Sequence, residues 1–199
     1  MRAGLVLLAL VLTIEVGIST AAAGLYISGN TGYVSAKDAR FEDSPAKGKV
    51  KFDPGSGISA ALGYRSGDRL RTEIEAAFRQ TPVDCVRTNS VGVATVEGEF
   101  STFSLLANAF YHLLPEQTVS PFIGGGLGGA KVETRFQGDG SEDDLVFAYQ
   151  LAVGIDFAVS QKGNIDLQYR FFATSEIEHG STDLEYTTHN LLLGFRYHF

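Results

Sequence analysis

Apolar and polar residues alternate along most of the chain after residue 24. In residues 70–79, one set of positions carries Leu, Thr, Ile, Ala and Phe, and the other carries Arg, Glu, Glu, Ala and Arg. A period of two is typical of a β-strand, because successive side chains point to opposite faces of a sheet. Charges of both signs on one face need water or each other as partners. A polar lumen provides both, whereas the apolar core of a β-sandwich provides neither.

The same alternation predicts eight strands, at residues 24–34, 57–65, 70–79, 99–113, 121–130, 145–157, 165–171 and 188–199. Four long connections, at residues 35–54, 81–98, 132–144 and 175–186, alternate with short ones. Long loops on one side and short turns on the other are typical of outer-membrane barrels. The predicted fold is therefore all-β, an eight-stranded antiparallel up-and-down transmembrane β-barrel. Because eight strands enclose a space that side chains just fill, we expect a packed polar lumen.

The last strand carries aromatic residues on one face and mostly polar residues on the other. Phe195, Tyr197 and Phe199 alternate with Arg196 and His198, and the chain stops on Phe199. A terminal aromatic residue gains little in a soluble strand, whereas it gains an apolar environment when that face of the strand meets lipid. The ending therefore favours a barrel in lipid over a soluble barrel of the lipocalin type, which would have an apolar lumen and a polar exterior.

The first 23 residues have the pattern of a secretory signal peptide. A short positive start at Arg2 precedes an apolar run, and small residues at 20–23 offer a cleavage site after Ala23. We expect residues 1–23 to be removed and residues 24–199 to form the barrel; a retained anchor is the alternative. Beyond residue 23 no apolar run approaches the roughly 18 residues that a spanning helix needs, so a membrane protein of this sequence must span as a closed barrel.

Composition narrows the classes of partner and chemistry. The net charge is −7, which argues against nucleic acid as a partner. The single cysteine, Cys85, cannot form an internal disulfide and is expected in a loop. The acidic segment 138–144 offers oxygen ligands but lacks the spacing of a calcium loop. We therefore expect no metal site and no cofactor.

Three stretches together resemble a known family. They are Gly-Leu-Tyr-Ile-Ser-Gly at residues 24–29, Pro-Phe-Ile-Gly-Gly-Gly-Leu-Gly at residues 121–128 and Asn-Leu-Leu-Leu-Gly-Phe-Arg-Tyr-His-Phe at residues 190–199. The chain resembles the OmpA-like superfamily of eight-stranded outer-membrane barrels, especially the small surface antigens and opacity-type, porin-like proteins of Gram-negative bacteria. The resemblance implies exposed variable loops. It also implies that Phe195, Tyr197 and Phe199 act as an insertion signal for the barrel-assembly machinery.

Polar residues predicted to face the lumen form the candidate site. They are Arg71, Glu73, Glu75, Arg79, Asn108, Gln150, Asp156, Asp166, Gln168, Arg170 and Arg196. Two interpretations stay open. The residues form a network of salt bridges that neutralise one another and plug the lumen, or they line a gated ion path, since lumen charges tune selectivity in barrels. We favour the plug because charges of both signs balance locally.

An enzyme is a third hypothesis. Some barrels of the family are esterases of lipid A with a paired His and Ser, and His179 and Ser181 lie in one connection here. Such a pair must sit on the lipid side of a strand with a carboxylate orienting the His, whereas these residues are predicted in an acidic loop. We therefore expect no catalytic residues.

These observations predict a non-catalytic protein of the bacterial outer membrane. The barrel would be an anchor, and the four long loops would be a surface for adhesion, host contact or envelope integrity. Expected partners are outer-membrane lipid, lipopolysaccharide, the barrel-assembly machinery and an extracellular or host ligand of the loops. The alternative is a narrow porin of low conductance that uses the lumen charges.

Overall fold

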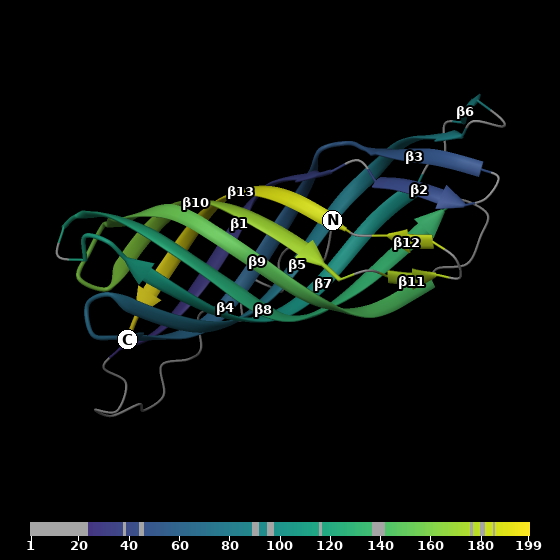
Figure 1. Cartoon of the computed structure of the whole chain (residues 1–199). Coiled ribbons are helices and arrows are strands. Elements are labelled where there is room, and N and C mark those ends of the chain that lie inside the picture. Colours follow the sequence, from purple (N-terminus) through teal and green to yellow (C-terminus); the bar gives the residue numbers. More distant parts are fainter. Residues whose placement is uncertain are drawn as a thin grey trace, which may run out of the picture.

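Eight antiparallel strands form a closed barrel. The computed structural model describes residues 24–37, 39–43, 46–88, 92–94, 98–115, 117–136, 142–175, 177–179, 182–184 and 186–199, so the expected leader lies outside the described residues. The barrel strands are β1 (Leu25–Ala36), β4 (Gly55–Ser66), β5 (Leu70–Thr88), β7 (Gly98–His112), β8 (Val119–Phe136), β9 (Glu142–Ala158), β10 (Gly163–Thr174) and β13 (Thr187–His198). Their order is β5-β4-β1-β13-β10-β9-β8-β7, and pairing of β7 with β5 closes the ring (Figure 1). The predicted fold class is confirmed.

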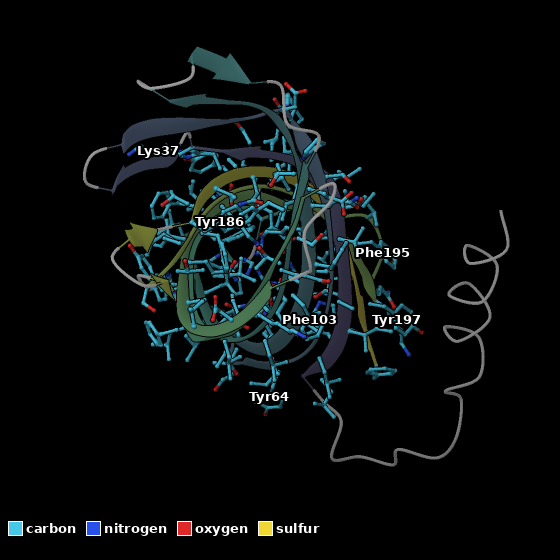
Figure 2. The ribbon with its side chains drawn as sticks, turned by 90° about the vertical axis from the view of Figure 1, so that its right-hand side faces the viewer. Lys37, Tyr64, Phe103, Tyr186, Phe195 and Tyr197 are labelled. Carbon is cyan, nitrogen blue, oxygen red and sulfur yellow. The ribbon has the colours of Figure 1, made fainter. Side chains whose placement is uncertain are left out.

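Large apolar side chains cover the outside of the barrel. Leu62, Phe103 and Leu127 are 60%, 53% and 60% exposed, and Figure 2 shows Phe103, Phe195 and Tyr197 pointing away from the barrel. A continuous apolar belt of this kind is far larger than the patches that soluble monomers expose. The outward face is therefore built to meet hydrocarbon. No helix in the described part of the chain is long and apolar enough to cross a membrane.

One end of the barrel carries short turns. Residues 67–69 join β4 to β5, and Gly67 adopts a φ of 65°, a left-handed conformation that glycine reaches without strain. The first described residues pair with the end of the chain, since Tyr26 lies opposite His198 and the Phe199 amide donates to the Leu25 carbonyl. The C-terminus therefore lies at this end, as Figure 1 shows.

At the opposite end the predicted long loops are wrong in part, because much of them is strand. The connection 35–54 contains β2 (Ala39–Asp43) and β3 (Ala46–Phe52), and β3 pairs with the far end of β5. The extension of β5 includes Cys85, so the predicted loop position of this residue is also wrong. Three short strands complete this end: β6 (Gly92–Ala94), β11 (Ile177–His179) and β12 (Thr182–Leu184). Backbone pairing continues past the point where the apolar alternation ends, so the alternation does not mark these strand ends.

Glycines on the inner face make room for neighbouring side chains. A methyl group on Gly126 would clash with Asn108 on the adjacent strand, and one on Gly124 would clash with the Phe110 ring. The glycine-rich segment of β8 therefore lets side chains of β7 lie flat across its backbone. Close approach of a lumen side chain is thus the role that the structure shows for this glycine run.

Candidate functional site

All eleven residues of the predicted candidate site lie on the inner face of the barrel. They come from β5, β7, β9, β10 and β13, and each is at most 5% exposed. Four are arginines, four are carboxylates and three are amides. The formal charges therefore cancel within the set. We call these eleven residues the lumen network.

Glu75 is the centre of the part of the network nearer the long connections. Its side chain is fully buried and forms an ion pair with Arg170. The two carboxylate oxygens also accept hydrogen bonds from Gln150 Nε2 at 3.1 Å and from Ser59 Oγ at 3.1 Å. Arg79 Nη2 donates to Gln150 Oε1 at 3.5 Å. One carboxylate thus connects strands β4, β5, β9 and β10 across the interior.

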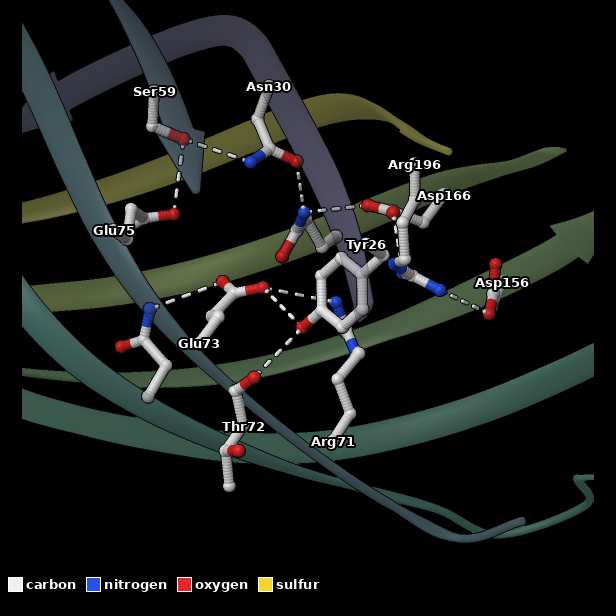
Figure 3. Close-up of polar contacts among 12 residues, drawn as sticks. Tyr26, Asn30, Ser59, Arg71, Thr72, Glu73, Glu75, Asp156, Asp166 and Arg196 are labelled. Carbon is white, nitrogen blue, oxygen red and sulfur yellow. Dashed lines mark hydrogen bonds and ion pairs between the residues drawn. The ribbon is translucent and has the colours of Figure 1, made fainter. Parts of the chain in front are cut away.

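A second carboxylate, Glu73, extends the network toward the short turns. It accepts hydrogen bonds from the Tyr26 hydroxyl at 2.8 Å and from Asn108 Nδ2 at 3.3 Å, and Arg71 Nη1 lies 3.5 Å from it. Asn108 Oδ1 in turn accepts from Gln150 Nε2 at 2.8 Å. The two glutamates are therefore joined through shared amide side chains. Figure 3 shows the contacts of the Glu73 carboxylate with the Tyr26 hydroxyl and with Arg71.

Arg196 forms the third centre. Its Nη1 donates to Asp156 at 2.9 Å and its Nη2 donates to Asp166 at 3.0 Å, so one guanidinium holds carboxylates from two strands (Figure 3). Asp166 accepts a further hydrogen bond of 2.6 Å from Gln168 Nε2, and Gln168 Oε1 accepts one of 2.8 Å from Arg170 Nε. The eleven predicted residues thus form one continuous network from the short turns to the level of Arg79.

The interior also contains aromatic rings that the prediction of a purely polar lumen missed. Phe110, Phe122 and Phe172 are each at most 1% exposed. The guanidinium carbon of Arg71 lies 4.1 Å from the Phe110 ring centre, and that of Arg79 lies 4.1 Å from the Phe172 ring centre. Such stacking stabilises a buried guanidinium without using its hydrogen bonds. The sequence held the signal, since the three phenylalanines share the alternation phase of lumen residues two positions away.

A layer of apolar side chains lies between the network and the long connections. Phe100, Leu106, Val132, Phe172 and Tyr186 belong to one buried cluster. The Tyr186 ring stacks on Phe100 with centres 5.2 Å apart, and its hydroxyl lies 3.2 Å from Thr81 Oγ1. Burial raises the pKa of the Tyr186 hydroxyl above its ordinary value. We call this cluster the apolar cap, and Figure 2 looks along the barrel onto Tyr186 within it.

The structure places the other predicted residues as follows. Phe195, Tyr197 and Phe199 lie on the outward face of β13 or at its end and are 51%, 38% and 37% exposed. Residue 181 and the greater part of segment 138–144 lie outside the described residues, as does the side chain of His179. Across the part of the chain that is described, no three His, Cys, Asp or Glu residues gather in a way that could hold a metal ion. The lumen network is thus the candidate site that the structure brings together.

Comparison with known proteins agrees with this architecture. The family model of the outer membrane protein beta-barrel domain matches residues 4–199. The chain belongs to this family. It is a bacterial outer-membrane protein, and both the predicted superfamily and the predicted location are confirmed. No curated protein sequence matches it.

Solved structures of the same fold are distant in sequence. Neisserial surface protein A has a TM-score of 0.60 at 18% identity, with 88% of this chain and 97% of that chain covered. OprG from Pseudomonas aeruginosa has a TM-score of 0.59 at 16% identity, with 89% and 98% covered. The outer membrane protease OmpT from Escherichia coli has a TM-score of 0.55 at 8% identity, with 92% and 99% covered. At these identities the similarity shows the fold alone.

Proposed function

We propose that this family member is a non-catalytic surface protein, in which the barrel is an anchor and the long-connection end is the interaction surface. The observation that carries the proposal is the continuous lumen network, with its charges balanced and its members buried. Because the interior is filled in this way, the long-connection end of the barrel is the part available to partners.

Two features of the interior oppose ion flow. An ion that entered the network would have to displace ion pairs such as Arg170–Glu75 and Arg196–Asp166. Breaking a buried pair costs about 3–5 kcal/mol, because the remaining charge is uncompensated. Above the network, an ion would also meet the apolar cap around Tyr186 and Phe172. Both features support an anchor and count against a narrow porin.

The long-connection end has the form of a small folded platform. The β2–β3 hairpin continues the wall of the barrel beyond the apolar belt by pairing with β5, and β12 lies against β2 (Figure 1). The hairpin sequence carries both acidic and basic residues, including Arg40, Glu42 and Lys49. Paired backbones hold a surface more rigidly than open loops do, which lowers the entropy cost of binding a partner. In this proposal the platform contacts lipopolysaccharide and an extracellular or host ligand.

Single-channel recording on the purified barrel tests the proposal against the porin alternative. We expect no resolvable conductance from the wild-type protein in planar bilayers. A matched variant, Arg79→Ala, removes a network side chain near the apolar cap and controls for the sensitivity of the recording. Discrete conductance steps from wild-type barrels, altered in size by Arg79→Ala, would favour the narrow porin.

The platform is tested on cells. Residues 39–52 are replaced by a short Gly-Ser turn, and folding is checked by the faster migration of the unheated barrel on an SDS gel. We expect the variant to reach the outer membrane and to lose adhesion to host cells or matrix, or the protection of the envelope against detergent. If neither phenotype changes, the platform has no interaction role.

Mass spectrometry of lipid A incubated with the purified barrel tests the enzyme hypothesis, and we expect an unchanged mass.

The proposal also includes delivery and assembly. Residues 1–23 would direct secretion and be cleaved, and the outward aromatic residues Phe195, Tyr197 and Phe199 would be recognised by the barrel-assembly machinery. The outward placement of these three side chains supports the second point, because a recognition strand must present its aromatic face before the barrel closes.

A further inference from the structure

A cavity of about 530 Å³ lies at the short-turn end of the barrel, outside the lumen network. It is bounded by the turn between β4 and β5 and by the connection between β7 and β8. The lining residues used below are Asp68, Arg69, Leu70, Leu113 and Leu114. In outer-membrane barrels the short turns face the periplasm, so the cavity lies at the periplasmic boundary of the membrane.

One wall of the cavity is apolar and faces outward. Leu70, Leu113 and Leu114 are 43%, 45% and 44% exposed. Leu70 and Leu113 follow the outward alternation of β5 and β7, and Leu70 lies opposite Tyr111 in the sheet. These leucines therefore lie at the periplasmic edge of the apolar belt. The part of an acyl chain nearest to its headgroup would contact them there.

The cavity is also lined by one cation, Arg69, and one anion, Asp68. Arg69 Nη1 lies 3.4 Å from both the Tyr111 hydroxyl and the Leu113 carbonyl oxygen, and its guanidinium lies 5.9 Å from the Tyr111 ring centre. These contacts fix the cation beside the leucines. Asp68 precedes it in the turn, and its backbone carbonyl accepts a hydrogen bond of 2.8 Å from Arg65 Nη2. Among the described residues, no ion pair of the Asp68 carboxylate is present.

We infer that this cavity binds the headgroup of a zwitterionic aminophospholipid of the periplasmic leaflet. Arg69 would bind the phosphate, and Asp68 would bind the ammonium group. The leucines would contact the part of an acyl chain nearest to the headgroup. A purely anionic headgroup fits less well, because Asp68 would repel it while Arg69 attracts it. Lipopolysaccharide is excluded by position, since it occupies the leaflet of the long loops. The inference rests on membership of the outer-membrane family and not on the proposed surface function.

Native mass spectrometry of the purified barrel tests this inference. The protein is equilibrated in micelles that contain equal amounts of phosphatidylethanolamine and phosphatidylglycerol with the same acyl chains, and the retained lipids are counted. We expect wild-type barrels to retain more phosphatidylethanolamine than phosphatidylglycerol. Arg69→Gln should lower this retention about fivefold, the effect of one basic side chain at a membrane surface. Asp68→Asn should shift the ratio of the two lipids toward phosphatidylglycerol by about the same factor.

A matched control lies at another short turn. Lys162 also carries a positive charge next to an outward tyrosine, with its Nζ 5.9 Å from the Tyr197 ring centre, and it lies outside the cavity. Lys162→Gln should therefore leave the ratio and the amount of retained lipid unchanged. All variants are first shown to be folded by their gel mobility. The inference is overturned if wild-type barrels retain both lipids equally, if Asp68→Asn leaves the ratio unchanged, or if Lys162→Gln has the same effect as Arg69→Gln.

Discussion

Replacing Glu75 should destabilise the barrel more than most single changes can. The carboxylate is fully buried, paired with Arg170 and hydrogen-bonded by Gln150 and Ser59. Glu75→Leu would leave the Arg170 guanidinium buried without its counter-charge. Removing one partner of a buried pair costs about 3–5 kcal/mol of unfolding free energy. With a urea dependence of about 2 kcal/mol per molar, the unfolding midpoint should fall by roughly 2 M.

The rescue variant tests the cause of this loss. In Glu75→Leu/Arg170→Met, both charges are replaced by apolar side chains, and such replacements of buried pairs are often neutral or stabilising. We therefore expect the double variant to recover at least half of the lost free energy. Asp53→Leu, which removes an exposed carboxylate, is the control and should change stability by no more than about 0.5 kcal/mol.

The assay uses the different gel mobility of folded and unfolded barrels. The protein in lipid vesicles is equilibrated in a urea series, and the folded fraction is read from unheated SDS gels; the chain has no tryptophan for the usual fluorescence assay. A loss below about 1 kcal/mol for Glu75→Leu would refute the reasoning, since surface pairs contribute that little. So would a double variant that is no more stable than Glu75→Leu.

Three further predictions concern the interior and the end of the chain. Gly126→Ala should lower the unfolding free energy by about 1–3 kcal/mol because the new methyl clashes with Asn108, whereas Gly129→Ala, with its nearest contact at 3.9 Å, should be neutral in the same gel assay. Tyr186→Ala should lower the unfolding free energy by about 3–5 kcal/mol, because the ring that stacks on Phe100 in the apolar cap is lost. An unchanged urea midpoint would contradict this prediction. Phe199→Ala should reduce the amount of barrel in the outer membrane, measured by fractionation, while refolding of the purified protein into vesicles stays unchanged; equal loss in both would show a stability effect.

Most of the architecture and the membership of the lumen set followed from the sequence. Period-two alternation assigns each side chain to one of two faces, and closure of the sheet turns these faces into an inside and an outside. This is why Arg71, Glu73 and Glu75 could be placed in the lumen from spacing alone. The same rule applies to Phe110 and Phe122, which are buried in the lumen although they are apolar. Strand ends were predicted poorly, because β5 continues to Thr88 through pairing with β3, a contact between distant segments.

The partners within the lumen were decided by the tertiary structure. Gln150 and Glu75 are 75 positions apart and Arg170 and Glu75 are 95 apart, and their side chains meet because the barrel brings β5, β9 and β10 around one narrow space. Register between neighbouring strands sets the height of each side chain along the axis, and alternation does not encode that height. Alternation along the chain assigns each strand residue to the lumen or to the lipid. Only the closed barrel decided which arginine neutralises which carboxylate, because these distances depend on the register of all eight strands at once.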